Sequence, residues 1–350
     1  MKTDRTTLTT NEKISLFISL STMLSAGITI IEAIDSLLDD AKGNQKRILT
    51  TLKDDLSQGK RIYASFSKFP YVFDSVTISI IKASEEAGTL DVTLKQIKNN
   101  IQKESEFMDG VMSALMYPFF IIVVFFLVLG MILVVVIPKI SQVFLRLKMP
   151  LPLPTKILIF LSDVVTKQTV PFFIGFSIIA AIIIIIFKSR NKQIMQFIFS
   201  LPGISNLVIQ IDLVRFTRSL AMLYTSGITI TSGLELCETI VMSQKVSKMI
   251  KQAKMTIFSG KQLSDSLKVH KDIVPSLMIK IIEAGERSGS LDTSLKEVSE
   301  FLDYQVERTL KTMTALIEPI MLVVVGALIG GMMLSIIAPI YGLIGQVGAR

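Results

Sequence analysis

The sequence is poor in the residues that usually carry enzyme chemistry. Its 350 residues include one cysteine, one histidine and no tryptophan. The single Cys237 excludes an internal disulfide and a cysteine-ligated metal site, and His270 alone cannot build a multi-histidine metal site. The Gly-Lys pairs at 59–60 and 260–261 lack the other residues of a phosphate-binding loop. We therefore expect a protein that is not an enzyme, with no catalytic residue, no cofactor and no metal.

Charged residues are absent from three long apolar runs, at 119–137, 170–187 and 320–338. Each run has 18 or 19 residues, and a helix needs about 20 to cross a bilayer. The mean hydropathy of +0.57 agrees with a membrane protein. Because no ionisable side chain interrupts the runs, an ion or proton path through them is disfavoured. The sequence predicts three transmembrane helices.

The N-terminal segment 1–13 is polar, and the apolar pattern that follows it is amphipathic rather than signal-like. We therefore expect a multi-pass protein with a cytoplasmic N-terminus and, after an odd number of spans, an external C-terminus. The basic residues beside the second and third spans support this orientation. Those beside the first span oppose it, so charge alone leaves the topology of that span open.

The chain contains an internal repeat. Residues 19–34 align with 219–234, and both segments contain Gly-Ile-Thr-Ile. Residues 82–95 align with 283–296 in the same way. Outside the spans the apolar residues follow helical spacing, and no alternating strand pattern competes with it. A long repeat indicates that one structural unit is present twice.

We expect an all-α membrane protein with two homologous cytoplasmic six-helix bundles and three transmembrane helices. The expected domains are an N-terminal tail (1–10), the first bundle (11–116), transmembrane helix 1 (117–138), an external loop (139–169), transmembrane helix 2 (170–187), the second bundle (188–317), transmembrane helix 3 (318–339) and an external C-terminal tail (340–350).

Acidic residues precede a glycine at the same place in each copy. Gly88 and Gly289 are expected to end a helix in a left-handed turn. Local capping does not require the charged side chains before them, so two interpretations remain. We favour solvated or structural side chains, because exposed charges contribute little energy. The alternative is a partner contact formed by Glu85, Glu86, Glu283, Glu286 and Arg287.

Small residues and prolines mark the spans. Gly326 and Gly330 form a GxxxG element that Gly331 extends, and small residues let helices approach closely in lipid. The face they form suits packing against the other spans or self-association about equally. Proline disfavours a helix at the preceding residue, so we expect a bend at the entry to spans one and three. The entry residues are Tyr117 with Pro118, and Glu318 with Pro319.

The net charge of +8 does not indicate nucleic-acid binding. The first 116 residues hold nearly equal numbers of acidic and basic side chains, and no basic face with interleaved aromatic residues is visible. Attraction to anionic membrane lipid accounts for the excess more simply. We expect no nucleic-acid partner.

The whole chain resembles the type II secretion system protein F family. The likeness lies in the paired GITI elements, in EEAGTLDVTL (85–94) and GERSGSLDTSL (285–295), in YP (117–118) with IP (137–138), and in EP (318–319) with AP (338–339). The resemblance implies a non-catalytic platform protein of the bacterial inner membrane, in a type IV pilus or type II secretion machine. It also implies as partners a cytoplasmic assembly ATPase and pilin or pseudopilin subunits. We further expect other inner-membrane assembly proteins and additional copies of the chain as partners.

One alternative of another class remains at this stage: a permease or channel component gated by its cytoplasmic bundles. It predicts polar or charged residues along a conduit, and the spans have no charged residue. The sequence does not distinguish a pilus from a secretion system.

Overall fold

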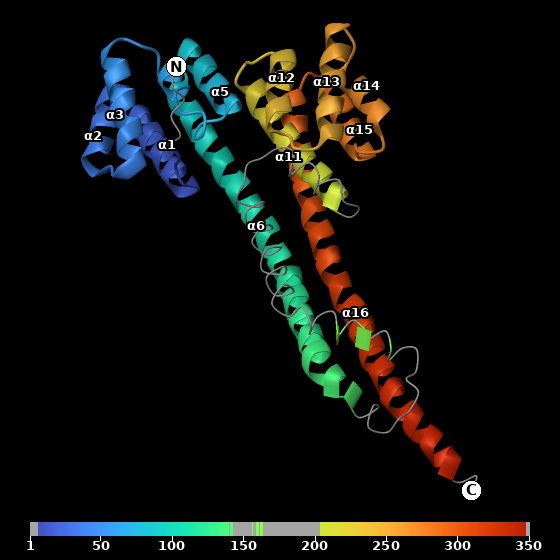
Figure 1. Cartoon of the computed structure of the whole chain (residues 1–350). Coiled ribbons are helices and arrows are strands. Elements are labelled where there is room, and N and C mark those ends of the chain that lie inside the picture. Colours follow the sequence, from blue (N-terminus) through green and yellow to red (C-terminus); the bar gives the residue numbers. More distant parts are fainter. Residues whose placement is uncertain are drawn as a thin grey trace. The chain divides into compact units, whose positions relative to one another are not determined.

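The computed structural model describes residues 6–139, 141–142, 156, 159–160, 162–163 and 204–347. All regular structure in these residues is helical, which confirms the all-α prediction (Figure 1). The expected second span, 170–187, lies outside the described residues. The chain divides into two compact units, one formed by residues 1–110 with 195–307 and the other by 111–194 with 308–350.

The first copy of the repeat begins with capped helices. Thr9 and Thr29 each form a capping box, with Glu12 and Glu32, before the first two helices. Gly88 has a φ of 70° and ends the fifth helix in the left-handed turn that the sequence predicts. The helices of this copy are α1 (Thr10–Ser25), α2 (Ile30–Asp40), α3 (Gly43–Ser57), α4 (Ile62–Phe66), α5 (Ser75–Ala87) and α6 (Leu90–Met131).

The core of the first copy is built around three phenylalanines. The ring of Phe66 lies 6.1 Å from that of Phe17 and 4.5 Å from that of Phe73, between centroids. The first pair is stacked and the second is edge-to-face, and such aromatic contacts add to the energy of burying the rings. Ile48 and Leu52 of α3 are also fully buried, as their helical spacing predicts.

The second copy repeats this order of helices, and Gly289, at a φ of 73°, ends its fifth helix as Gly88 does in the first. Phe216 and Leu302 are fully buried in its core. The helices are α11 (Ile204–Thr225), α12 (Ile230–Ile240), α13 (Gln244–Phe258), α14 (Leu263–Leu267) with the 3₁₀ turn η2 (Lys268–His270), α15 (Ser276–Ser288) and α16 (Leu291–Val347). The structure therefore supports duplication of one helical unit.

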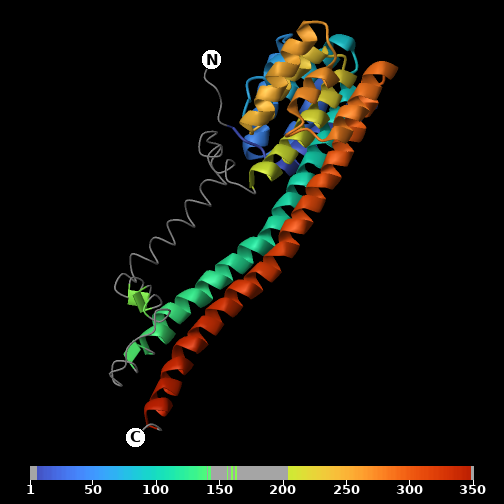
Figure 2. The same cartoon turned by 90° about the vertical axis from the view of Figure 1, so that its right-hand side faces the viewer.

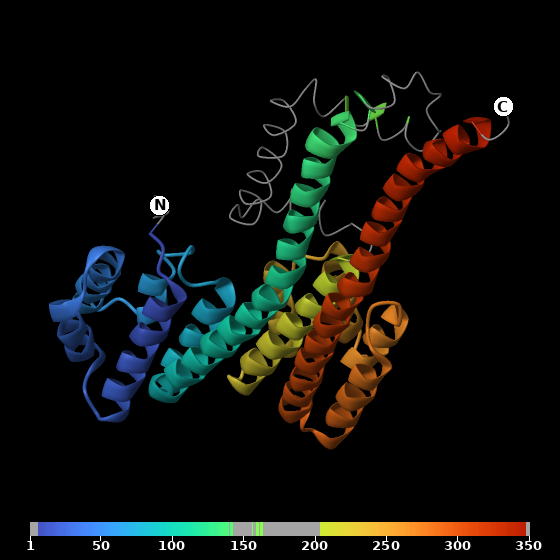
Figure 3. The ribbon, with the colours of Figure 1, turned by 90° about the horizontal axis from the view of Figure 1, so that it is seen from below.

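The two copies contact each other through different faces. Helix α5 of the first copy contacts α11 and α12 of the second, and the hydroxyls of Ser75 and Thr239 lie 3.0 Å apart. Helix α11 lies between α6 and α16 (Figure 3). We call this contact of α5 and α6 with α11 and α12 the inter-copy joint.

Among the residues that the structure describes, two helices are long and apolar enough to cross a membrane, over Leu90–Lys139 and Leu291–Gly331. They include α6 and α16, whose parts in the second unit run in the same direction (Figure 2). Large apolar side chains on them are exposed, Phe120 by 64% and Val323 by 70%, and lipid rather than water suits such surfaces. Within the second unit, Thr314 of α16 donates to the carbonyl of Ala114.

The prolines at the span entries do not interrupt these helices. Pro118 lies inside α6, and α16 continues through position 319. Both prolines thus lie within continuous helices, and the bend expected at the span entries stays a prediction. After Met131 the first helix changes to a π-helix, η1 (Ile132–Val136), whose Leu133 carbonyl accepts a hydrogen bond from Ser162.

Candidate functional site

Glu85 supports the start of a short helix. Its carboxylate accepts hydrogen bonds from the backbone N–H groups of Ile62, at 2.9 Å, and Tyr63, at 3.2 Å. The first N–H groups of a helix have no partner within the helix, and the residue before α4, Arg61, provides no side-chain cap. Glu85 therefore replaces the missing cap from the end of α5.

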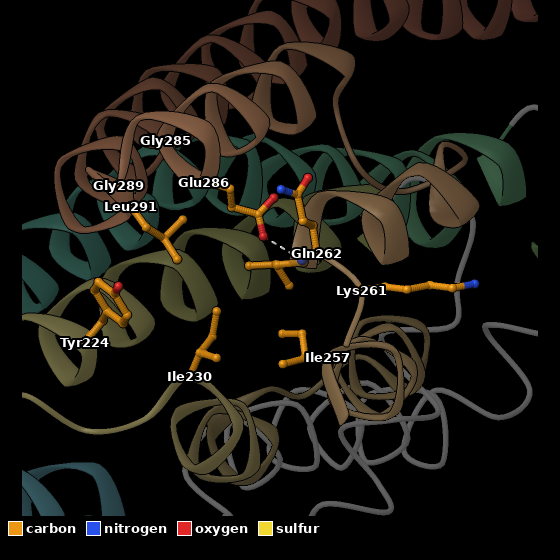
Figure 4. Close-up of a pocket in the computed structure, with 10 residues that line it drawn as sticks. Tyr224, Ile230, Ile257, Lys261, Gln262, Gly285, Glu286, Gly289 and Leu291 are labelled. Carbon is orange, nitrogen blue, oxygen red and sulfur yellow. Dashed lines mark hydrogen bonds between the residues drawn. The ribbon is translucent and has the colours of Figure 1, made fainter. Parts of the chain in front are cut away.

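Glu286 plays the same part in the second copy. Its carboxylate accepts from the N–H groups of Leu263, at 2.6 Å, and Ser264, at 3.1 Å; Figure 4 draws the first of these bonds. Gln262, before α14, also makes no side-chain capping bond. Both glutamates are thus partly buried structural groups, and their carboxylates are already occupied by backbone donors.

The other three candidate contact residues lie nearer to solvent. Glu86 is exposed and pairs with Arg61 at 3.4 Å. Arg287 pairs with Glu283 at 2.7 Å, and Glu283 also pairs with Lys268 at 3.3 Å. Hydrogen bonding to Glu283 raises the pKa of Lys268. Glu86 and Arg287, which occupy equivalent positions in the two copies, carry opposite charges.

A cleft of about 310 Å³ lies beside Glu286 in the second copy (Figure 4). The side chains of Tyr224, Ile230 and Ile257 form much of its wall. Close packing limits one side, because a Cβ at Gly285 would lie 2.2 Å from the Ser294 hydroxyl. The remaining lining residues are Lys261, Gln262, Leu263, Glu286, Gly289 and Leu291.

Ion pairs join three helices at the inter-copy joint. Glu104 of α6 accepts from Arg215 Nε at 2.8 Å and from Arg218 Nη1 at 2.9 Å. Arg218 also forms a bidentate pair with Asp303 of α16, at 2.8 and 2.7 Å, and its guanidinium lies 5.5 Å from the centre of the Phe107 ring. Burial raises the pKa of Asp303, against the lowering effect of Arg218.

This network was not expected from the sequence. Only 11% of the Arg218 side chain is exposed, so it is the buried centre of the cluster. A usable signal is the departure from the repeat: Arg215 and Arg218, three residues apart on one helix face, stand where the first copy has Ser15 and Ile18.

Each copy also buries a different carboxylate. Asp55 in α3 is bound by Lys60, Lys68 and Ser65. Burial alone would raise its pKa, but these hydrogen bonds lower the pKa to about 2.

Asp212 in α11 has only backbone donors, the N–H groups of Met242 and Ser243. Its second oxygen is buried without a hydrogen-bond partner in the described structure. Burial dominates and raises the pKa of Asp212 to about 6.

The candidate membrane residues are placed on the two long helices. A Cβ added to Gly326 or Gly330 would meet no described atom within 4 Å, so the described part of the chain does not close this face. Gly331 is half-buried, whereas Tyr117 and Glu318 are exposed. Whether the glycine face packs on another span or on a second copy stays a prediction.

Within the described residues, no cluster of three or more histidine, cysteine, aspartate or glutamate side chains is placed to hold a metal ion. The nitrogen Nε2 of His270 lies 2.9 Å from the side-chain oxygen of Gln252. Cys237 is buried, which raises the pKa of its thiol.

The comparisons with known proteins cover nearly the whole chain. Type IV pilus assembly protein PilC of Thermus thermophilus is 28% identical over 344 residues, which are 95% of this chain and 82% of that protein. The PilC of Myxococcus xanthus is 26% identical over 332 residues, 93% of this chain and 79% of that protein. Type II secretion system protein F of Pseudomonas aeruginosa is 27% identical over 336 residues, 94% of this chain and 82% of that protein.

The family model described as type II secretion system (T2SS), protein F, matches residues 16–138 and 216–339. These matches fall on the two copies of the repeat and together cover more than half of the chain. The chain therefore belongs to the type II secretion system protein F family.

Proposed function

We propose that this chain is a non-catalytic platform protein in the inner membrane of a bacterium, where it serves a type IV pilus or a type II secretion machine. Its relatives in pilus assembly and in type II secretion support this role. The proposal places two homologous six-helix bundles in the cytoplasm, three helices in the membrane and the N-terminus inside. It names a cytoplasmic assembly ATPase and pilin or pseudopilin subunits as partners, beside other assembly proteins.

One structural observation carries the mechanism: each copy of the repeat passes into an apolar segment through a single unbroken helix. Helix α6 has 42 residues and α16 has 57, and both begin directly after the αL glycine of their copy. A continuous helix resists bending and stretching, so a displacement of its cytoplasmic end moves its apolar end. A motor bound to the bundles would in this way act on pilin subunits in the membrane.

The acidic helix ends are the proposed ATPase contact, and the structure separates them into two groups. Glu85 and Glu286 are occupied by backbone N–H groups, so their removal disturbs α4 and α14 whether or not a partner binds. Glu86, Glu283 and Arg287 form surface pairs, which contribute little to stability. Substitutions at these three positions therefore report on a partner.

The test of the platform role is deletion and complementation in the native bacterium. Deletion is expected to abolish surface pili or the export of secreted proteins, and the full-length chain is expected to restore them. Chemical cross-linking in membranes, followed by mass spectrometry, is expected to join the chain to a secretion-type ATPase and a pilin-like subunit. A deletion strain with normal pili and normal export would overturn the proposal.

The ATPase contact is tested with Glu86→Lys and Arg287→Glu in the full chain. Both are expected to weaken the cross-link to the ATPase while the chain remains folded in the membrane. Glu300→Lys, an exposed charge reversal elsewhere on α16, is the matched control and should leave the cross-link unchanged. Normal assembly and normal ATPase cross-linking in the Glu86→Lys and Arg287→Glu double variant would exclude this surface.

A further inference from the structure

In the inter-copy joint, the two copies of the repeat contact each other through different helices. The first copy contributes α5 and α6, and the second contributes α11 and α12, which are the counterparts of α1 and α2. Each copy therefore has a second face, equivalent to the one that the other copy uses in the joint, which the joint does not cover. The first copy leaves its α1/α2 face uncovered by the joint, and the second leaves its α15/α16 face uncovered. An interface between unlike faces continues from unit to unit until it closes on itself.

The exposure of equivalent residues shows the two unused faces. Val76 on α5 is 2% exposed, whereas its counterpart on α15, Leu277, is 45% exposed. The Arg218 side chain on α11 is 11% exposed, and its counterpart on α1, Ile18, is 45% exposed. Large apolar side chains thus remain in solvent at the positions that the joint covers in the other copy.

The charges on the two unused faces are complementary. Asp39 and Asp40 are exposed at the end of α2, where α12 has Thr239 and Ile240. Lys280 is exposed on α15, one turn after Ser276, the counterpart of Ser75. In the joint Ser75 touches Thr239, so an equivalent contact between two chains would bring Ser276 to Asp39 and Lys280 close to the acidic pair. Two α2 ends facing each other would instead oppose like charges.

The same contact can form between two chains that lie in one membrane. The bundle parts of α6 and α16 both belong to the first unit and run in the same direction (Figure 3), so the operation that relates the two copies preserves the direction of these helices. Applied once more, it gives a neighbouring bundle whose α6 and α16 leave it in that same direction, as two chains in one membrane require. The network of Glu104 is not reproduced in that contact, because Gln305, Ser15 and Ile18 stand at the equivalent positions.

We propose that the α1/α2 face of one chain binds the α15/α16 face of a second copy in the same membrane, in the manner of the inter-copy joint. The contact is head-to-tail, with Asp39 against Ser276 and Lys280. Ile18 and Leu277 become buried in it. The proposal does not depend on which ATPase or pilin the platform serves.

The experiment is disulfide cross-linking of the full chain in its native membrane, with Cys237→Ser as background. Asp39→Cys combined with Ser276→Cys is expected to give dimers and larger species on oxidation. Either cysteine alone should give none, and two chains that carry one cysteine each should give dimers only. Ser75→Cys with Thr239→Cys is the matched control, because that pair is in contact within one chain and should cross-link without any increase in mass.

Two outcomes would overturn the proposal. Dimers from Asp39→Cys alone or Ser276→Cys alone would indicate a symmetric contact between like faces. Monomers from the Asp39/Ser276 pair, under conditions in which the control pair is fully oxidised, would exclude the contact. A second readout uses Asp40→Cys with Ser276→Cys, a pair that keeps Asp39. In this pair Lys280→Glu is expected to reduce cross-linking up to about fivefold, as loss of an exposed ion pair does, and the addition of Asp39→Lys should restore it.

Discussion

Helices α2 to α5 of the first bundle begin and end at the positions equivalent to those of α12 to α15 in the second, but the two bundles bury different charges. In the first bundle the buried carboxylate is Asp55, held by two lysines and a serine. In the second bundle Thr256 stands at that position, and the buried carboxylate is Asp212 on another helix, held by backbone N–H groups alone. The pKa is about 2 for Asp55 and about 6 for Asp212.

This difference shows which features two copies of one unit must share. Glu85 and Glu286 cap α4 and α14 through the same pair of backbone donors, because a five-residue helix cannot satisfy its own ends. Core charges are less constrained, since a buried carboxylate needs donors but not a particular set of them. The two copies therefore share one arrangement of helices but differ in their buried charged residues.

The largest expected effect is at the joint, where the copies differ most. Arg218→Ala removes the cation shared by Glu104 and Asp303, and we expect a loss of about 3 kcal/mol, at the lower end for broken buried pairs because both carboxylates are partly exposed. Hydrogen exchange of the full chain in detergent should show faster exchange in α11 and in the bundle part of α6.

The control for Arg218 is its counterpart Ile18, which is exposed. In a detergent-solubilised monomer, where no second copy covers Ile18, Ile18→Ala should change exchange in α1 by less than about 0.5 kcal/mol. Equal effects of the two substitutions would mean that the network does not hold the copies together.

The next prediction tests the glutamate caps of α4 and α14, which the two copies share. Glu85→Gln and Glu286→Gln each weaken two charge-assisted bonds to backbone N–H groups, so each should cost about 1.5–3 kcal/mol. Amide exchange should accelerate in α4 for the first variant and in α14 for the second. Glu86→Gln, which alters only a surface pair, is the control. A large effect in one copy with none in the other would contradict the equivalence of the two caps.

Local patterns in the sequence were sufficient to predict the helical arrangement that the two copies share. The positive φ at Gly88 and Gly289 and the all-helical class follow from residues close together in the chain, and the duplication follows from the alignment of 19–34 with 219–234. The role of Glu85 does not, because its backbone partners lie 22 and 23 residues away. The sequence left Glu85 and Glu286 between a structural role and a partner contact, and the structure gives both a structural bond.

The ion network at the joint shows a second limit. Arg218 reaches Glu104 across 114 residues and Asp303 across 85, and no periodicity within one helix reveals such a pairing. The comparison of the two copies offers the only local sign, a pair of arginines where the other copy has Ser15 and Ile18. The packing partner of the glycine face of α16 likewise depends on neighbours that sequence spacing does not identify.

The pH dependence of the two bundles should have opposite signs. A lowered pKa means that Asp55 stabilises the first bundle above pH 4 and that this contribution is lost as the pH falls toward 2. A raised pKa means that folded Asp212 holds its proton more tightly than the unfolded chain does, so the second bundle loses stability as the pH rises from 4 to 6. Between pH 7 and pH 5 the second bundle should gain about 1 kcal/mol and the first should gain nothing from Asp55.

Thiol labelling in urea measures each bundle separately. Cys237 is buried in the second bundle, and Ala33→Cys in a Cys237→Ser background places a probe in the core of the first. The urea midpoint for Cys237 should rise from pH 7 to pH 5, and Asp212→Asn should remove that rise. A midpoint that is independent of pH in the unsubstituted chain would contradict the raised pKa of Asp212.

The smallest expected effect compares two equivalent serines. The Ser65 hydroxyl donates to Asp55 at 3.0 Å, whereas the hydroxyl of its counterpart, Ser266, is buried without a hydrogen-bond partner in the described structure. Ser65→Ala should therefore cost about 1 kcal/mol, and Ser266→Ala should be neutral or stabilising by a similar amount, because it removes an unsatisfied polar group. The urea midpoints of the two thiol probes measure both changes. A loss of stability in Ser266→Ala would show that this hydroxyl has a partner in the membrane-bound protein, and the contrast between the two buried sites would then rest on the aspartates alone.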